Sequence, residues 1–372
     1  MSERVLITGG GGFIGRHLVR ALSERGNHVR VLDNLNEQVH GLMASAQFLG
    51  PDVETIIGDM RDAGLVRRSL KNVDKVVHLA AEVGVGQSMY AVERYVSAND
   101  CGTAVLMEAL TENPVDRIVV ASSMSIYGEG LYRDADGNFV EDLPLPARRV
   151  SGNLGWDPVD RLGRPLIPLP TPEWKQPRLV SVYALTKYVQ ERLVMLMAAA
   201  YGMDAVALRL FNVYGSGQAL SNPYTGVLAI FASRLLNGQR PVIFEDGQQR
   251  RDFVHVSDVV RAFLLALDHP AAPGNVYNVG SGEHRSISAV AELLAAAMGR
   301  SEIEPEITGQ ARAGDIRHCF ADISKIRDEL GFVPQASFTD GLIELARWVE
   351  RQEAQDRVPK ARMELESRGL VA

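Results

Sequence analysis

An apolar run, RVLIT, leads at the start of the chain into GGGGFIG and then into an amphipathic stretch, FIGRHLVRALSERG. Gly9, Gly12 and Gly15 are therefore spaced three residues apart where a predicted strand meets a predicted helix. Without side chains, these glycines permit a tight turn and a close approach of a ligand to the backbone. The start of a helix also offers free N–H groups to a pyrophosphate. The junction predicts a βαβ unit that binds a dinucleotide.

The rest of the first half repeats this alternation. The β-branched runs HVRVLD, VETIIGD, KVVHLA, RIVVASS and AVALRL are separated by helical patterns near residues 62–70, 88–112 and 180–202. Strands that alternate with helices are typical of a parallel sheet covered on both faces. We predict an α/β chain with a Rossmann-type doubly wound parallel sheet and a smaller α/β C-terminal substrate lobe.

Changes in composition and periodicity indicate where the parts of the chain begin and end. Residues 129–175 are rich in Pro, Gly and Asp and show little periodicity, so we interpret them as an inserted loop, either a lid or a plain surface excursion. The C-terminal tail is charged and contains a proline, and we expect it to fray. The expected parts are the NAD-binding Rossmann domain at 1–178, its remainder at 179–215, the substrate lobe mainly at 216–352, with return segments to the sheet, and the tail at 353–372.

Composition excludes several classes of protein. The formal net charge of -7 gives no general positive field for nucleic acid. Cys101 and Cys319 are the only cysteines, which excludes a disulfide framework and a cysteine-built zinc site, and no metal is expected. The first residues resemble a strand rather than an export signal, and no apolar run is long enough to span a bilayer. We expect a cytoplasmic protein without nucleic-acid or membrane partners.

An acidic residue after the second predicted strand selects the cofactor. Asp33 lies 18 positions beyond Gly15, where it can accept hydrogen bonds from a ribose diol and repel a 2′-phosphate. NAD is therefore favoured over NADP, although Arg16 beside the loop could serve a 2′-phosphate instead of being an ordinary solvated arginine. The predicted cofactor contacts are Gly9, Gly12, Phe13, Ile14, Gly15, Asp33, Asn34, Asp59, Met60, Leu79, Ala80, Ala81, Tyr183 and Lys187.

Several motifs together resemble a known family. TGGGGFIG, VVASSMSIYG and YALTK are similar to the extended short-chain dehydrogenase/reductase superfamily, in particular its NAD-dependent sugar-nucleotide epimerases and dehydratases. HLAA, LRLFNVYG, QRRDFVHVSDV, YNVGSG and ARAGDIRHCFAD extend the resemblance over nearly the whole chain. NLNEQVHG, EVGVGQSMY and ALSNPYTGVLAIFASR look most like the branch that acts on 6-deoxyhexoses, the dTDP-L-rhamnose 4-epimerases.

The resemblance gives Tyr183 and Lys187 a chemical meaning. A Tyr and a Lys four residues apart share one helix face and are usually a solvated pair. Here the lysine ammonium and the positive nicotinamide ring would favour the phenolate over a phenol of pKa ~10, so that Tyr183 can remove a sugar hydroxyl proton. Ser123 stands where the superfamily carries its third catalytic hydroxyl. We expect Ser123, Tyr183 and Lys187 to be catalytic.

Met124 and Ser125 discriminate among reactions of the superfamily. In the superfamily that this chain resembles, dehydratases typically carry an Asp and a Glu at these positions. These two side chains serve as the acid and base that expel the C6 hydroxyl as water. Neither residue here supplies a carboxylate. What remains is transient oxidation at C4 to a 4-keto sugar, turnover of the ring and hydride return to the opposite face, which inverts the configuration.

The same resemblance suggests how a nucleotide sugar is held. Asn212 resembles a diphosphate contact, Arg251 and Arg312 resemble phosphate arginines, and guanidinium groups suit paired phosphate oxygens. Arg251 could instead bridge to Asp252. PVIFEDG would line the base, with Phe244 as apolar surface, but cannot tell thymine from uracil. The expected substrate contacts are Gln87, Ser88, Ser123, Ser125, Asn212, Tyr224, Phe244, Arg251, Arg312 and Asp315.

The favoured hypothesis is an isomerase that acts as an NAD-dependent 4-epimerase on a dTDP-6-deoxyhexose. The alternatives are a UDP-sugar 4-epimerase, a 4,6-dehydratase or 4-ketosugar reductase, and a non-catalytic NAD-bound sensor. The resemblance also implies a homodimer, in which the helices around 88–112 and 180–202 form a four-helix interface. Apolar faces on these helices would equally suit the core of a monomer.

Overall fold

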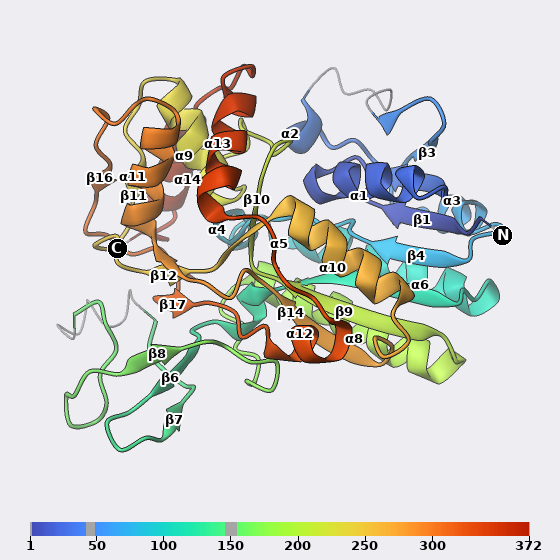
Figure 1. Cartoon of the computed structure of the whole chain (residues 1–372), viewed down its shortest axis with the longest axis horizontal. Helices are drawn as coiled ribbons and strands as arrows, with labels where there is room; N and C mark the ends of the chain where they lie inside the picture. Colours follow the sequence, from blue (N-terminus) through green and yellow to red (C-terminus); the bar gives the residue numbers. More distant parts are fainter. Residues whose placement is uncertain (1, 42–48, 146–154, 372) are drawn as a thin grey trace.

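The computed structural model describes residues 2–41, 49–145 and 155–371. Its centre is a parallel sheet with the strand order β14-β9-β5-β4-β1-β2-β3, which lies behind a layer of helices in Figure 1. The predicted Rossmann-type doubly wound sheet is confirmed, with a crossover on each side of β1. The strands are β1 (Arg4–Thr8), β2 (His28–Asp33), β3 (Glu54–Ile57), β4 (Lys75–His78), β5 (Arg117–Ser123), β9 (Asp204–Leu210) and β14 (Asn275–Val279).

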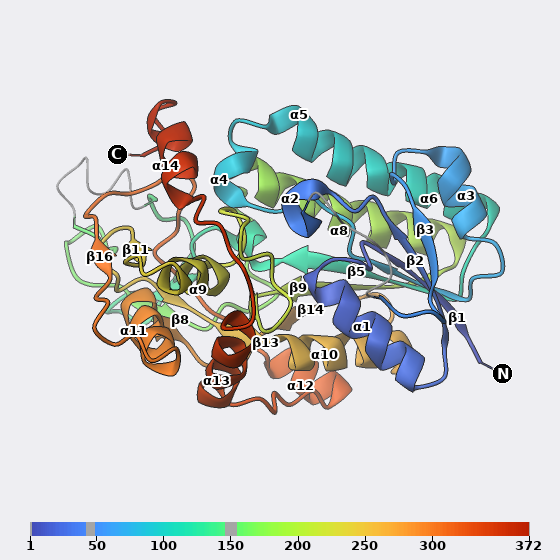
Figure 2. The ribbon, with the colours of Figure 1, turned by 90° about the horizontal axis from the view of Figure 1, so that it is seen from above.

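Helices cover both faces of this sheet, as Figure 2 shows. Along β1, Val5 and Ile7 join the core formed with helices of one face, whereas Leu6 joins the core of the other, as the period of a strand requires. The first face carries α1 (Phe13–Glu24), α10 (Val256–Asp268) and α12 (Ser324–Leu330). The second face carries α3 (Ala63–Ser69), α6 (Gly102–Glu112) and α8 (Val182–Tyr201).

The long helix expected over 88–112 is interrupted. The chain forms α4 (Val85–Ser88), α5 (Val92–Tyr95), a π-helical turn (Val96–Cys101) and then α6. The π turn carries Asn99, whose side chain accepts a hydrogen bond from the backbone N–H of Glu82 and donates to the Thr186 hydroxyl on α8. Such turns occur where a helix must re-aim a side chain. Here Asn99 joins the loop after β4 to α8.

A smaller α/β lobe lies beyond the sheet. Its core packs three helices, α9 (Val227–Leu236), α11 (Ile287–Ala297) and α13 (Phe338–Val349), within the described residues. Short strand pairs link it to the sheet: β10 (Asn212–Tyr214) with β13 (Phe253–His255), β11 (Val242–Ile243) with β16 (Glu306–Ile307), and β12 (Arg250–Arg251) with β15 (Arg285–Ser286) and β17 (His318–Cys319).

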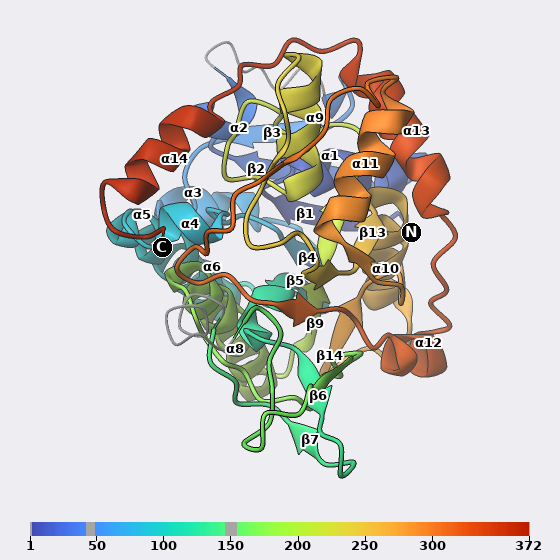
Figure 3. The ribbon, with the colours of Figure 1, turned by 90° about the vertical axis from the view of Figure 1, so that its left-hand side faces the viewer.

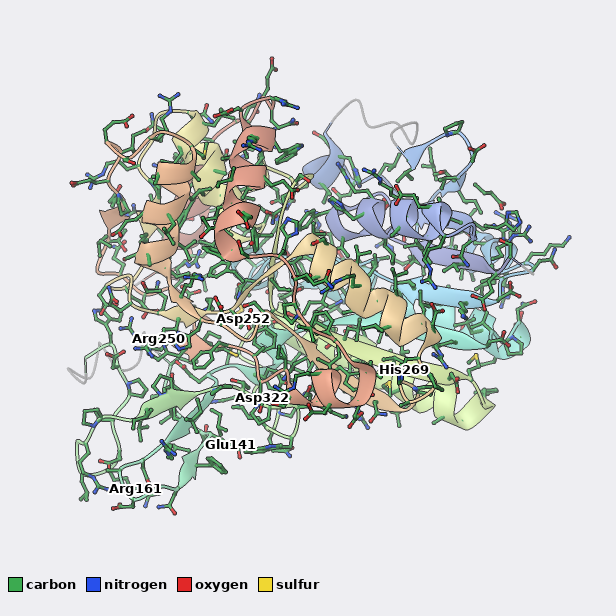
Figure 4. All side chains as sticks on the ribbon, in the orientation of Figure 1. Glu141, Arg161, Arg250, Asp252, His269 and Asp322 are labelled. Carbon is green, nitrogen blue, oxygen red and sulfur yellow. The ribbon has the colours of Figure 1, made fainter. Side chains whose placement is uncertain are left out.

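The inserted segment forms a small antiparallel sheet of its own, β6 (Leu131–Arg133), β7 (Phe139–Val140) and β8 (Ile167–Leu169). It projects at the lower left of Figures 1 and 4, where Figure 4 labels Glu141 and Arg161. A buried Glu129 anchors its root, because the carboxylate accepts hydrogen bonds from the backbone N–H groups of Arg317 and His318. Residues 146–154 lie outside the described residues.

The C-terminal segment differs from the expected frayed tail. Residues Val358–Glu366 form helix α14, which packs beside α4. In the part of the chain that the structure describes, no helix is long and apolar enough to cross a membrane. The remaining short elements are α2 (Glu37–His40) and a 3₁₀ turn (Met124–Tyr127).

Candidate active site

A cavity of about 380 Å³ opens at the carboxyl ends of β1, β2, β4 and β5. This is where ligands bind in doubly wound sheets. We call it the glycine-loop cavity. Every predicted cofactor contact lines it: Gly9, Gly12, Phe13, Ile14, Gly15, Asp33, Asn34, Asp59, Met60, Leu79, Ala80, Ala81, Tyr183 and Lys187. Arg16, whose role the sequence left open, lines the same cavity.

At Gly9 and Gly15 the loop leaves no room for a side chain. Gly9 has φ 71°, and a Cβ there would lie 2.7 Å from the backbone nitrogen of Ala80. A Cβ on Gly15 would lie 2.5 Å from the carbonyl oxygen of Gly9. The loop therefore packs backbone against backbone, and it presents the N-terminus of α1 to the cavity.

Asp33 is held firmly at the end of β2. One carboxylate oxygen accepts the N–H of Gly11 (2.9 Å) and the other accepts the N–H of Leu35 (2.8 Å). Carboxylate oxygens have further lone pairs for a ribose diol. A glycine cradle beside an oriented acid fits the phosphates and ribose of NAD, so the residues present suit this cofactor.

Tyr183 and Lys187 lie in the first two turns of α8. Ser181 caps the helix by accepting the N–H of Ala184, and Ser88 from α4 accepts the N–H of Tyr183 (3.0 Å). Burial raises the pKa of Tyr183, and a hydrogen bond with Ser123 opposes that shift. Burial also lowers the pKa of Lys187 to about 7. Burial alone brings the pKa of Lys187 near neutrality, whereas Tyr183 needs added positive charge in the cavity to lower its pKa.

Gln190 is a functional neighbour that the sequence reasoning missed. Its side-chain oxygen accepts a hydrogen bond from Lys187 Nζ (2.6 Å), while its nitrogen contacts the Thr103 hydroxyl (2.8 Å) and the His78 ring (3.1 Å). Burial lowers the pKa of His78 to about 3, so the ring stays neutral beside the lysine. Gln190 lies three residues after Lys187 on the same helix face, and this spacing was the available signal.

Ser123 ends β5 at the junction with a second cavity. Its Oγ lies 2.8 Å from Ser125 Oγ, and it caps the 3₁₀ turn that follows. Met124 is buried, and its sulfur accepts a hydrogen bond from Asn212 Nδ2 (3.4 Å). Glu129 cannot replace the acid of a dehydratase, because its carboxylate is committed to Tyr132 and to two backbone N–H groups. The positions after Ser123 therefore offer no acid for elimination.

The second cavity, about 440 Å³, extends from this junction to the smaller lobe. We call it the arginine cavity. Ser123 and Tyr183 line both cavities. The predicted substrate contacts that line the arginine cavity are Ser123, Ser125, Asn212, Tyr224, Phe244, Arg251, Arg312 and Asp315.

Its two predicted phosphate arginines are oriented by different partners. Arg312 pairs with Asp315 (2.9 Å) and lies over the Phe244 ring at 4.4 Å. Arg251 donates to the carbonyl oxygens of Ile316 and Arg317, so the alternative of a bridge to Asp252 is not observed. Asp252, labelled in Figure 4, instead accepts hydrogen bonds from the segment around Ser281.

Two predicted sugar contacts need correction. Ser88 is fully buried, since its hydroxyl donates to the Val85 carbonyl and accepts the N–H of Tyr183. Gln87 exchanges hydrogen bonds with Gln38 and accepts one from Tyr95. Neither lines the arginine cavity, because the first turn of α4 uses both polar groups to build the walls. They support the site from behind.

The described part of the insertion lies away from both cavities. None of its described residues lines either cavity. The C-terminal helix does reach the arginine cavity, through Val358, Ala361, Arg362 and Leu365. Sequence reasoning missed this contribution, because nothing in the tail's composition indicates where it docks.

Comparisons with known proteins agree with this geometry. The model of the NAD dependent epimerase/dehydratase family matches residues 5–150 and 167–280. A dTDP-L-rhamnose 4-epimerase of Burkholderia thailandensis is 35% identical over 355 residues, which cover 94% of this chain and 96% of that protein. Among the similar solved structures, the two that follow each have a TM-score of 0.75. A UDP-glucose 4-epimerase of Thermotoga maritima with UDP-glucose is 30% identical and shares 93% of this chain and 98% of its own. A Thermus thermophilus UDP-glucose 4-epimerase with NAD is 29% identical and shares 94% and 100%.

The chain therefore belongs to the NAD-dependent epimerase/dehydratase family, as its motifs predicted. Within that family it is an NAD-dependent 4-epimerase, and hence an isomerase. The predicted cofactor is confirmed by the family and by relatives solved with NAD.

Proposed function

We propose that this chain inverts C4 of a dTDP-linked 6-deoxyhexose such as dTDP-L-rhamnose. One observation carries the proposal: Ser123 and Tyr183 line both cavities, so their hydroxyl groups lie where a cofactor in the first would meet a sugar in the second. The similarity to the Burkholderia thailandensis protein supports the 6-deoxyhexose.

The arginine cavity would hold the nucleotide diphosphate. Arg251 and Arg312 supply positive charge, and the pairing of Arg312 with Asp315 fixes its guanidinium plane. Phe244 offers an apolar face to a base, with Arg312 stacked on its other side. Charge-assisted bonds from planar guanidinium groups suit the two phosphates of such a ligand.

The glycine-loop cavity would hold NAD, which supplies the group that accepts hydride from C4 and returns it. Tyr183 would take the proton of the C4 hydroxyl and give it back after the ring has turned over. Ser123 orients the sugar oxygen, and its own hydrogen bond to Tyr183 favours the phenolate by lowering the tyrosine pKa. Lys187 adds positive charge nearby, and Gln190 positions its ammonium.

The test uses purified protein mixed separately with dTDP-L-rhamnose, dTDP-glucose, UDP-glucose and UDP-N-acetylglucosamine. Mass spectrometry and proton NMR follow the products. A C4 epimer of unchanged mass from dTDP-L-rhamnose is the expected result. Loss of one water from any of them would contradict the interpretation of Met124 and Ser125.

A UDP-sugar is the second candidate substrate. The neighbour from Thermotoga maritima contains UDP-glucose, and the apolar surface of Phe244 would suit uracil as well as thymine. Turnover of UDP-glucose without turnover of dTDP-L-rhamnose would select this alternative.

A homodimer is part of the proposal. The outer faces of α5 and α8 expose four large apolar side chains: Val92 (45%), Leu185 (44%), Leu196 (57%) and Tyr201 (54%). Apolar side chains exposed together in this way are typical of a protein–protein interface. Two such helices from each copy would form the expected four-helix interface. Light scattering should give twice the chain mass, and Leu196→Glu should shift it toward the monomer.

A cytoplasmic location is also proposed, because Cys101 and Cys319 are free thiols.

A further inference from the structure

Helix α14 closes one side of the arginine cavity. Val358, Ala361, Arg362 and Leu365 all line that cavity, although they come from the last residues of the chain. Figure 3 shows α14 beside α4, and Figure 2 shows the same arrangement from above. A segment this near the terminus normally frays unless specific contacts hold it.

Glu364 supplies the first of these contacts. Its carboxylate accepts hydrogen bonds from the hydroxyls of Tyr90 (2.7 Å) and Tyr224 (3.0 Å). The two hydroxyls also lie 2.6 Å from each other, and Arg368 stacks 4.5 Å from the centre of the Tyr90 ring. One carboxylate thus ties α14 to the segments around residues 90 and 224, and Tyr224 is one of the expected substrate contacts.

The residues after α14 supply the second contact. The N–H of Ala313 donates to the carbonyl oxygen of Leu370 (2.9 Å), and Val371 pairs with Arg312 as an isolated antiparallel bridge. Arg362 donates to the side chain of Gln310 (3.0 Å). The tail is therefore fastened to the same segment that carries the phosphate arginine Arg312.

Between these two anchors, α14 presents an apolar surface. Leu365 is 6% exposed and Ala361 is 7% exposed. A Cβ built on Gly86 would lie 3.5 Å from a δ-methyl group of Leu365 and 4.0 Å from the Tyr224 ring. Gly86 belongs to α4, and Ser88 of that helix holds the backbone of Tyr183. Leu365 therefore packs against α4, the same short helix whose Ser88 holds the backbone of Tyr183.

We infer that α14 is the wall of the sugar site that selects the substituent at C6, with Leu365 as the specificity-determining residue. This inference rests on the proposed function. C6 lies two bonds from the reacting C4, so it must face the walls around Tyr183. A methyl group gains from contact with Leu365 and Ala361, whereas a hydroxyl or carboxylate placed against these two side chains would lose water without a hydrogen bond from either. The structure therefore assigns the site to a hexose without oxygen at C6.

The first experiment compares two substrates that differ only at C6, dTDP-L-rhamnose and dTDP-L-mannose, with Leu365→Gln. We expect the wild type to prefer the 6-deoxy sugar in kcat/KM, and the variant to reduce this ratio by about tenfold, since polar groups discriminate more strongly than methylenes. Met363→Gln is the matched control, because Met363 lies on the same helix with 62% exposure and should leave the ratio unchanged. An equal effect of Leu365→Gln on both substrates would overturn the inference.

The second experiment is independent of turnover. Limited trypsin digestion of the full NAD-bound chain cuts the tail after Arg357, Lys360, Arg362 or Arg368. The tail fragments are followed by mass with dTDP, with UDP or with neither. Because Arg362 lines the arginine cavity, a bound nucleotide should slow the cut after Arg362 several-fold. Equal cutting in all three samples would overturn the placement of α14 as a wall of the site. Protection without epimerisation of any sugar would instead reject the proposed function and keep the wall.

Discussion

The two cavities that meet at Ser123 and Tyr183 differ in how far apart their lining residues lie in the sequence. The glycine-loop cavity draws on segments that each carry a local signal, such as the glycine spacing around Gly9 or the acid at Asp33. The arginine cavity draws on separate parts of the smaller lobe and on the last helix of the chain. A ligand held mainly by backbone leaves a pattern in the sequence, whereas a ligand held by side chains from distant segments leaves little.

The largest expected effect is at Tyr183, one of the residues that line both cavities. Tyr183→Phe removes the hydroxyl that would move the C4 proton and leaves the ring packed against Tyr95. We expect turnover to fall by about 10²- to 10⁴-fold, the usual contribution of a general base. Product NMR measures the rate, and absorbance of the cofactor released on denaturation measures bound NAD. Near-normal turnover would break the link between the cavities.

A second substitution acts on the glycine-loop cavity alone. Gly15→Ala would place a methyl group 2.5 Å from the Gly9 carbonyl oxygen, which must displace backbone at a cost of about 1–3 kcal/mol. We expect loss of most bound NAD and a lower melting temperature. Gly12→Ala is the matched control, because its Cβ would meet the same oxygen at 3.3 Å. Equal NAD content in both variants would mean that the backbone cradle is not what holds the cofactor.

A third substitution acts on the arginine cavity alone. Arg312→Ala removes the guanidinium that pairs with Asp315 and stacks on Phe244. A charged hydrogen bond contributes about 1.5–3 kcal/mol, so KM should rise about 10- to 100-fold with a smaller change in kcat. NAD content should stay unchanged. Arg20→Ala, at an exposed surface pair, is the control. Loss of NAD from Arg312→Ala would show that the cavities are not separable.

Much of the site was predictable, and the exceptions have physical reasons. The strands, the sheet type and all the predicted cofactor contacts follow from short motifs whose geometry is local. Gln87 and Ser88 lie near the predicted place, but a sequence does not show whether a polar group faces the cavity or satisfies a buried backbone. Gln190 also contacts Thr103, and Glu364 contacts Tyr224. Both partners are distant in the chain, and no local pattern indicates these contacts, unlike the three-residue spacing of Lys187 and Gln190.

Burial of Lys187 in the glycine-loop cavity, the cavity that the sequence predicted better, lowers the stability of the fold. Burial lowers its pKa to about 7 from 10.5, so the unfolded chain binds more protons than the folded chain between these values. The free energy of unfolding should therefore rise with pH across this window, and the full cost is present below pH 7. Lys187→Met removes this dependence. Its stability relative to the wild type should be greatest below pH 7 and decline as pH rises.

Urea unfolding at several pH values from 6.5 to 9.5 measures this difference. Loss of the hydrogen bond to Gln190 adds an offset that does not depend on pH over this range, so the slope carries the test. Lys360→Met, at an exposed position in α14, should show no slope. A flat difference for Lys187→Met would mean that the lysine keeps its charge at no cost inside the cavity.

The smallest expected effect sharpens the comparison at the C-terminal wall of the arginine cavity. Hydrogen bonds from Tyr90 and then Tyr224 lower the pKa of Glu364, so this carboxylate is charged throughout the neutral range. Its stabilising contribution is present at neutral pH and is lost only in acid, as pH falls through the lowered pKa.

Glu364→Gln keeps one acceptor but weakens both bonds from charged to neutral, and a hydrogen bond contributes about 1 kcal/mol. Trypsin should cut the tail about two- to threefold faster at pH 8, whereas Met363→Gln, on the exposed side of the same helix, should not change the rate. Equal rates for Glu364→Gln and the wild type would show that the apolar contact of Leu365, rather than the carboxylate, holds α14 in place.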